Sequence, residues 1–345
     1  IDDEVRAEAK SISFDGSVGK AGATSTNFTS VMHNLIEQML LSMKAEAAAN
    51  KAIEAIRDGR KPVITVANTM GSFLAEYAEE NSIGNGGEMP LDFRALLYRY
   101  LDRTRRIVVR RPFSNEKGEV IYISDSQLGP AGVAAFKAVM RQIDAMPLED
   151  VPISPIDHIR QRIMDAGFKV GEITGRDAAL DYSGDVPRFR MRGGKERSIQ
   201  GRRDAITGFN SGTIDAMILN QAGSTGLSLH ASATFKDQRR RHMIIAQAER
   251  NIDTHMQMLG RVHRTGQVIA PEYDQLVAGV PAEMRPAAVL AKKMASLNAN
   301  TTGARDSAMS AEDIPDFMNE YGDEVASRMM EEEPDLHRRL AKPLK

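Results

Sequence analysis

The sequence predicts an α/β protein, with a parallel sheet flanked by helices and a helical extension at the carboxyl end. Short apolar runs alternate with helical patterns, and each run is long enough for one buried strand. Loops rich in Gly, Ser and Thr follow several of these runs, and the chain after residue 270 is rich in Ala and Met with helical spacing. Strands that alternate with helices are typical of parallel sheets covered on both faces.

A long helix is predicted from residue 29 or 30, where Thr and Ser are good N-caps, to about residue 58. Its apolar positions recur at four-residue steps, at Val31, Leu35, Met39 and Met43. Gly59 is expected to end it. Further helices are predicted over 69–77, 93–101, 156–166 and 253–262, and strands over 63–67, 169–173, 214–219 and 242–246.

These elements divide the chain into parts. Residues 1–28 are predicted to form a flexible lead-in, and residues 29–270 a core domain. Residues 81–150 are less regular and are interpreted as an insertion into that domain. Residues 271–345 are predicted to form a helical accessory extension.

Composition excludes several classes of protein. The 345 residues contain no Cys, which excludes disulfides and thiolate zinc sites and fits a reducing compartment such as the cytoplasm. No apolar run is long enough to span a membrane, and the seven His are scattered, so no protein-ligated metal is predicted. The net charge of −2 means that any nucleic-acid binding must depend on local basic patches.

The segment from Gln257 to Gln267 carries the strongest chemical pattern. On the predicted helix, Gln257, Gly260, Arg261 and Arg264 occupy positions i, i+3, i+4 and i+7 and share one face. Gly260 would let another backbone approach closely. Two guanidiniums on one face suit a triphosphate, since each offers a planar fork of donors and keeps its charge. The alternative is a solvated helix end.

A glycine-rich loop follows the predicted strand 214–219. It contains Gly223, Ser224, Thr225 and Gly226, whose backbone N–H groups and hydroxyls could contact phosphate oxygens. Loops at the carboxyl ends of parallel strands are where ligands are expected. Taken alone, such a loop is most often only a turn.

Together these segments resemble motifs of superfamily-2 helicases and translocases. The pattern Gln-x-x-Gly-Arg-x-His-Arg-x-Gly-Gln at 257–267 resembles motif VI, and residues 223–230 resemble motif V. With residues 33–36, 61–70, 154–157 and 171–176, the chain resembles the C-terminal helicase domain of the strawberry notch family, including its bacterial and phage relatives. The similarity spans roughly residues 27 to 305.

The resemblance implies a RecA-like second motor domain of an ATP-dependent DNA helicase or translocase. It implies Arg264 as the arginine finger, Arg261 as its partner on the γ-phosphate, and Gln257 as the group that positions the nucleotide or the attacking water. It also implies that residues 223–226 and Gly260 contact the nucleotide or couple its state to the nucleic acid. ATP and Mg²⁺ would be held mainly by an N-terminal RecA-like domain, in the same polypeptide or in a partner chain.

The chain shows no motif of its own for holding ATP and Mg²⁺. The nearest phosphate-loop candidate, Gly16 to Ala21, has the wrong glycine spacing and no Ser or Thr after Lys20. Asp2-Asp3-Glu4 has no apolar strand before it, so it does not resemble a Mg²⁺-holding motif. The chain alone is therefore expected not to hydrolyse ATP.

A basic segment lies between residues 186 and 203. It has seven basic residues and one acid, and it is interpreted either as a flexible arm that follows a phosphate backbone or as a solvated loop. The nucleic-acid contacts predicted there are Arg188, Arg190, Arg192 and Lys195. Thr174, Arg176 and Thr225 are added by the resemblance alone, because related motors touch the nucleic-acid backbone at such strand ends.

A second hypothesis is a non-catalytic helicase-like module, used for nucleic-acid binding or assembly, for instance in a phage particle or an anti-restriction system. The retained Arg261 and Arg264 argue against it. A nuclease or methyltransferase is not supported within this chain, because neither a clustered carboxylate site nor a strand-linked glycine-rich loop for a methyltransferase cofactor indicates one. Whether DNA or RNA is bound, and whether strands are separated, stays open.

Overall fold

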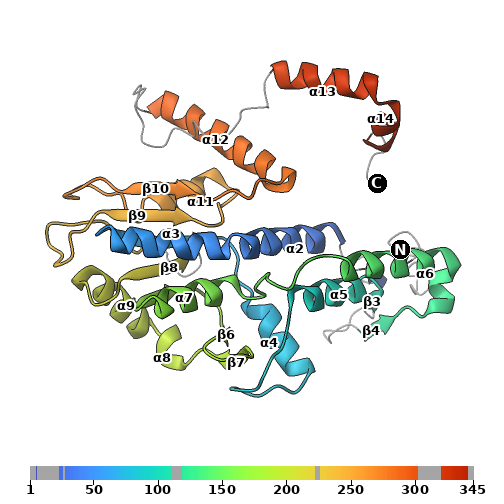
Figure 1. Ribbon diagram of the computed structural model, residues 1–345, viewed down its shortest axis with the longest axis horizontal. Coiled ribbons are helices and arrows are strands. Elements are labelled where there is room, and N and C mark those ends of the chain that lie inside the picture. Colours follow the sequence, from blue (N-terminus) through green and yellow to red (C-terminus); the bar gives the residue numbers. More distant parts are fainter. Residues whose placement is uncertain are drawn as a thin grey trace.

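A computed structural model describes residues 5, 23–25, 28–109, 119–221, 226–301 and 320–340. Its centre is a sheet of five parallel strands in the order β10-β9-β2-β8-β5 (Figure 1). The strands are β2 (Lys61–Val66), β5 (Val170–Ile173), β8 (Ala216–Asn220), β9 (Arg241–Ile245) and β10 (Glu272–Gln275). The predicted α/β class with a parallel sheet is confirmed.

Helices cover both faces of this sheet because its strands are apolar on both sides. On one face, Ile64 and Ile218 pack with α3 (Ala45–Arg57) and α7 (Pro155–Asp165). On the other face, Val63 and Met217 pack with α9 (Ile199–Ser211) and α11 (Ile252–Leu259). Neighbouring residues of a strand point to opposite faces, so each strand supplies both layers of the core.

The remaining elements lie around this core. They are α2 (Phe28–Met43), α4 (Gly71–Glu80), α5 (Phe93–Arg103), α6 (Asp125–Asp144), α8 (Gly194–Arg197), α12 (Pro281–Thr301), α13 (Glu320–Glu332) and α14 (Pro334–Leu340), with strands β1 (Ala23–Ser25), β3 (Arg106–Val109), β4 (Glu119–Tyr122), β6 (Ala178–Asp181) and β7 (Arg188–Met191). None of the described helices is long and apolar enough to cross a membrane.

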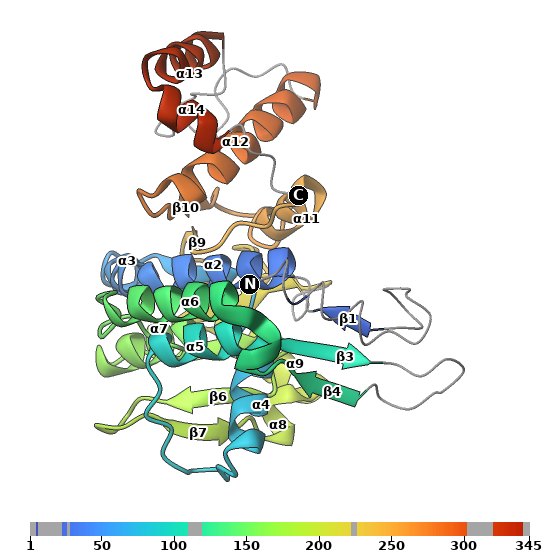
Figure 2. The ribbon, with the colours of Figure 1, turned by 90° about the vertical axis from the view of Figure 1, so that its right-hand side faces the viewer.

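The segment interpreted as an insertion contributes no strand to the central sheet. Its strands β3 and β4 pair antiparallel, and β1 joins them at the β3 edge. Figure 2 shows this small sheet extending from the body beside α5 and α6. The glycine-rich stretch of this segment is a turn next to β7, where Gly86 N donates to Phe189 O.

Three predicted boundaries differ from the structure. The helix predicted over 29–58 is two helices, interrupted at Lys44, whose buried ammonium donates to Leu276 O at 3.1 Å and pairs with Glu283. Helix α11 ends at Leu259 and not at residue 262, because Gly260 stabilises a helix poorly. The core sheet also continues past residue 270, since β10 pairs with β9. Its Glu-Tyr-Asp-Gln sequence lacks the apolar run that predicted the other strands.

Candidate nucleotide and nucleic-acid site

The structure places the motif VI segment against the end of the loop that follows β8. Leu229 N donates to Arg261 O at 2.8 Å. The Arg264 guanidinium donates to Leu227 O at 3.0 Å, and the Gln221 amide donates to Gln257 Oε1 at 3.5 Å. Predicted site residues from two distant segments are thus brought together. Gly223, Ser224 and Thr225 lie outside the described residues, whereas Gly226 is described and has a φ of 77°.

The geometry of the arginine pair differs from the predicted single helical face. Gln257 lies on α11, but Gly260 is its C-cap and the chain then turns. Arg264 begins a turn in which Gln267 N donates to its carbonyl oxygen. Its Nε still donates back to Gly260 O at 3.4 Å, so the exposed Arg264 guanidinium lies next to the helix end. The Arg261–Arg264 pair is therefore formed by a helix end and a turn.

Arg261 differs from every other buried arginine among the described residues. Only 7 % of it is exposed, its Nε is buried without a hydrogen-bond partner, and no carboxylate pairs with it. Burial, and then the charge of Arg264, lower the pKa of Arg261. The other buried arginines each pair with acids: Arg105 with Asp125, Arg176 with Asp157 and Glu172, Arg192 with Glu172, and Arg241 with Asp237.

A buried cation without a counter-ion is costly, because its hydration is lost and nothing replaces it. Arg264 adds a second positive charge nearby and likewise makes no ion pair within the described chain. The two guanidiniums therefore form a site that fits an anion with several oxygens, such as a polyphosphate. The observation that supports this fit is that Arg261, alone among the buried arginines of the described residues, has no carboxylate partner.

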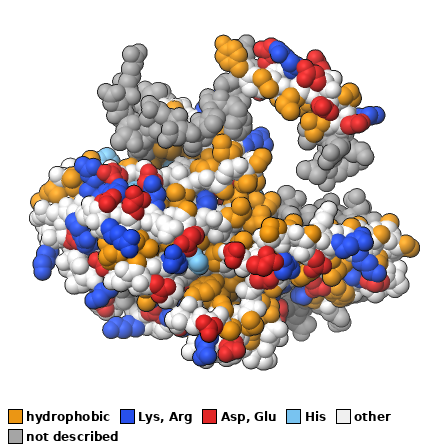
Figure 3. Space-filling model, viewed as in Figure 1, with side chains coloured by type: hydrophobic (Ala, Val, Ile, Leu, Met, Phe, Trp, Pro, Cys, Tyr) orange, Lys and Arg blue, Asp and Glu red, His pale blue; other side chains and the backbone are white. Residues whose placement is uncertain are grey.

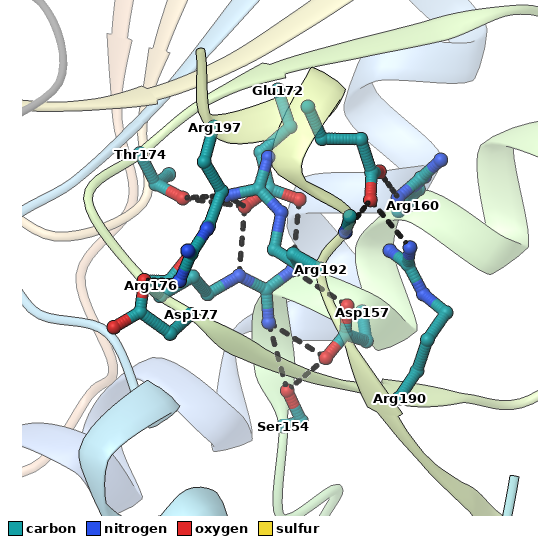
Figure 4. Close-up of polar contacts among 12 residues, drawn as sticks. Ser154, Asp157, Arg160, Glu172, Thr174, Arg176, Asp177, Arg190, Arg192 and Arg197 are labelled. Atoms are coloured by element: carbon teal, nitrogen blue, oxygen red, sulfur yellow. Dashed lines mark hydrogen bonds and ion pairs between the residues drawn. The ribbon is translucent and has the colours of Figure 1, made fainter. Parts of the chain in front are cut away.

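Arg176, predicted from resemblance to touch nucleic acid, lies inside a buried ion cluster (Figure 4). Its side chain is 0 % exposed and donates to Asp157 at 2.6 Å and to Glu172 at 2.7 Å. Arg192 donates to Thr174 Oγ1 at 3.0 Å, and the Thr174 hydroxyl donates to Glu172 at 2.5 Å. Thr174, Arg176 and Arg192 therefore point into the protein and present no donor to a ligand at the surface.

This cluster connects α7, the end of β5 and the β6–β7 hairpin. Burial alone would raise the pKa of Glu172, but the charges of Arg176 and Arg192 and the hydrogen bonds of Arg176 and Thr174 lower it to about 2. Gly71, at the start of α4, lies so close that an added Cβ would be 2.5 Å from the Arg176 Cβ. The sequence did not reveal this role, because acids and bases on separate segments become partners only in the fold.

The basic segment predicted as a flexible arm is ordered secondary structure, formed by β7, α8 and the start of α9. Arg190 pairs with Glu196 at 2.7 Å, and Arg197 with Asp177 at 2.5 Å. The more exposed Arg188 approaches Glu88 at 3.5 Å. Three cations of this segment make no ion pair with any described residue, namely Lys195, Arg202 and Arg203.

Charges of both signs mix over the rest of the face in view. Figure 3 shows Lys and Arg side chains interspersed with Asp and Glu side chains on the body of the protein. Within the ranges that the structure describes, no group of three or more His, Asp or Glu side chains could hold a metal ion.

The parallel five-stranded sheet and its helical layers are those of a RecA-like α/β helicase C-terminal domain. The chain belongs to the strawberry notch family: residues 132–339 match the family described as the C-terminal domain on Strawberry notch homologue.

The relatives are much longer than the matched segment. Strawberry notch homolog 1 of Homo sapiens is 30% identical over 200 residues, covering 56% of this chain and 14% of that protein. Strawberry notch homolog 2 of Mus musculus is 37% identical over 124 residues, covering 35% of this chain and 9% of that protein. FORGETTER 1 of Arabidopsis thaliana is 30% identical over 175 residues, covering 50% of this chain and 13% of that protein.

Proposed function

We propose that this chain is the second motor domain of an ATP-dependent DNA helicase or translocase. The observation that carries the proposal is the Arg261–Arg264 pair, which has no carboxylate partner, whereas the other buried arginines of the described chain have one. Two cations held without counter-ions are what a site for a triphosphate requires. Membership of a helicase C-terminal domain family agrees with this function.

In this proposal each residue has a separate task. Arg264 is exposed and reaches the γ-phosphate, where its guanidinium neutralises the charge that develops in phosphoryl transfer. Arg261 is held more rigidly, because it is buried and its backbone is bonded to Leu229. Gln257 orients the nucleotide or the attacking water. ATP with Mg²⁺, held mainly by another RecA-like domain, supplies the bond that is hydrolysed.

The neighbouring loop is proposed to report the nucleotide state to the nucleic acid. The described end of this loop contacts motif VI through Leu227 and Leu229. Gly223, Ser224, Thr225 and Gly226 would bring backbone N–H groups near phosphate oxygens. Gly260, whose own N–H donates to Met256 O, would allow the nucleotide or another backbone to approach closely. Movement of Arg264 toward a phosphate would break its bond to Leu227 O, so that the loop responds directly.

The proposed nucleic-acid surface consists of exposed and half-buried cations of β7, α8 and α9. Lys195, Arg202 and Arg203 make no ion pair with described residues, and Arg188 is 58% exposed in its side chain. Cations without partners can release counter-ions from a phosphate backbone, which gives salt-dependent binding. Thr174, Arg176 and Arg192 would support this surface from beneath, and Thr225 would contact the backbone from the motif V loop.

Replacing Lys195, Arg202 and Arg203 together by Ala should weaken binding of single-stranded DNA and make it less salt-dependent. Each lost phosphate contact lowers the slope of log K against log salt by about 0.7, so the slope should fall by about 2. Fluorescence anisotropy with a labelled oligonucleotide between low and moderate salt measures both quantities. The control variant replaces three other exposed cations, Arg57, Lys137 and Arg141, by Ala. If the control loses as much DNA affinity and salt dependence as the first variant, the proposed surface is wrong.

The function itself is tested by measuring DNA-stimulated ATP hydrolysis for the 345-residue chain and for a polypeptide that also carries the nucleotide-holding RecA-like domain. We expect no turnover above background from the chain alone and clear turnover from the complete motor. Turnover in the complete motor without any dependence on Arg261 or Arg264 would contradict the proposal. Activity of the chain by itself would contradict it equally.

A further inference from the structure

A cavity that neither Arg261 nor Arg264 lines lies at the carboxyl ends of β9 and β10. Its volume of about 310 Å³ is at the lower end of the range for small-ligand pockets, about 300–1,000 Å³. The loop 247–250 after β9 forms one wall, and Gln275 at the end of β10 forms part of another. Pro286, Ala287 and Leu290 of α12 supply an apolar wall. Crevices at this end of a parallel sheet are common ligand sites.

Four of the eight polar side chains that line the cavity have hydrogen-bond or ion-pair partners. Gln247 accepts from Ala67 N at 3.2 Å and Asn68 N at 2.9 Å. Glu37 pairs with Arg250 at 2.5 Å, and Glu283 pairs with Lys44. The charges of Glu37 and Glu283 are thus balanced by Arg250 and Lys44.

Glu249 is the exception among the lining acids. It is half-buried, and its Oε1 atom is buried without a hydrogen-bond partner. Burial raises the pKa of its carboxyl group. At the rim, the exposed Arg285 and Lys293 line the same cavity and make no ion pair with a described residue. The cavity therefore offers an acceptor inside, an apolar wall beside it and two cations outside.

We propose that this cavity binds a nucleoside monophosphate unit whose base carries an exocyclic amine. The amine would donate to Glu249, the flat base would pack against Pro286 and Val289, which are the more exposed apolar residues of the α12 wall, and the phosphate would face Arg285 and Lys293. A carboxylate accepts well from a base amine. Uracil is disfavoured, because carbonyl oxygens flank its ring N–H and would face the Glu249 carboxylate. The unit can be a free nucleotide or one residue of a nucleic-acid strand.

This site is separate from the proposed ATP contacts, since neither Arg261 nor Arg264 lines the cavity. The two are nevertheless connected along the chain. The loop 247–250 leads directly to Asn251, whose side chain caps α11 by accepting from Asp253 N and Thr254 N. A ligand that fixes this loop would fix the start of α11, which ends at Leu259, two residues before Arg261.

Isothermal titration calorimetry on the 345-residue chain tests the site, because the chain has no Trp to report binding by fluorescence. The probes are GMP, AMP, CMP and UMP, followed by a short single-stranded oligonucleotide. We expect the three amine-bearing nucleotides to bind more tightly than UMP. Glu249→Gln should weaken their binding about tenfold or more, since a hydrogen bond to a charged acceptor is lost.

Two variants keep the result interpretable. Glu249→Gln should fold normally, because it removes a carboxylate that burial destabilises. Val289→Phe should fill part of the cavity and reduce binding without removing any charge. Glu79→Gln, an exposed acid on α4, serves as the matched control and should bind like the unmodified chain.

The outcomes separate this inference from the proposed function. Mononucleotide binding that depends on Glu249 supports a free ligand, and oligonucleotide binding with the same dependence and no mononucleotide binding supports a strand residue. Absence of binding by every probe overturns the inference, as does binding that Glu249→Gln and Val289→Phe leave unchanged. Binding that only Arg261→Ala and Arg264→Ala abolish would place the ligand at the arginine pair and overturn this site alone.

Discussion

Arg264→Ala, introduced into a complete motor that contains this domain, is expected to lower ATP turnover by about 10³- to 10⁵-fold. The guanidinium is exposed, makes no ion pair with described residues, and is bonded only to the carbonyl oxygens of Gly260 and Leu227. Its removal should therefore cost little folding stability. Binding of ATP should largely survive, because in the proposed function another motor domain makes most contacts to the nucleotide. Steady-state hydrolysis and equilibrium nucleotide binding measure the two effects separately.

The matched control for this experiment is Arg57→Ala, which removes an exposed arginine at the end of α3. It should leave turnover unchanged. Arg264→Lys adds a second comparison, since Lys keeps the charge but loses the planar fork of donors. Unchanged ATP turnover in Arg264→Ala would show that Arg264 does not act on the nucleotide, and the proposed role would be wrong.

Arg176→Ala is expected to destabilise the fold by about 3–5 kcal/mol, the largest stability effect that the structure predicts. The reason is that Asp157 and Glu172 would both stay buried, each at 3% side-chain exposure, after losing their main counter-ion. Of these two acids, Arg192 pairs only with Glu172, so it cannot replace Arg176 at Asp157. Urea unfolding followed by circular dichroism measures the free energy of unfolding.

The pH dependence of this variant distinguishes ion pairing from lost packing. In the unmodified chain the pKa of Glu172 is lowered to about 2, so its ionised form stabilises the fold above the unfolded pKa. This contribution is lost as the pH falls from about 5 toward 2. Without Arg176, the ionised form of Glu172 contributes less to stability, so acid removes less of it. The difference in free energy of unfolding between the unmodified chain and Arg176→Ala should therefore become smaller as the pH falls over that range. A difference that is constant with pH would show that packing, and not charge, is responsible. Arg328→Ala on the exposed α13 is the control and should be neutral at every pH.

The sequence was sufficient to predict the α/β class, four of the five central strands and the segment that carries the arginine pair. These features depend on local apolar runs and on one contiguous motif. It missed β10, because an edge strand beside β9 needs few apolar residues and its Glu-Tyr-Asp-Gln pattern suggests a loop. It also extended α11 too far, because the helical spacing of Arg261 and Arg264 outweighed the low helix propensity of Gly260.

The residues predicted to contact nucleic acid show where sequence reasoning reaches its limit. Arg188, Arg190, Arg192 and Lys195 look equivalent in the sequence, but their surroundings range from fully buried to exposed. Arg192 is buried because it crosses from the hairpin to Glu172, a pairing over 20 residues along the chain. Ionic partners at such separations depend on the fold and leave no local pattern. Glu249 was missed for the same reason, since an acid in a loop shows its burial only in three dimensions.

The position of β10 determines how the protein can be divided for experiments. A fragment cut at residue 270 would end before this strand and would leave the backbone N–H and C=O groups of β9 without their neighbour from Glu272 to Gln275. Unpaired edges of this kind recruit strands from other molecules. Such a fragment would also lose Glu283, the partner of the buried Lys44. The smallest well-behaved piece should therefore extend through at least the first turns of α12, and a shorter piece should precipitate on purification.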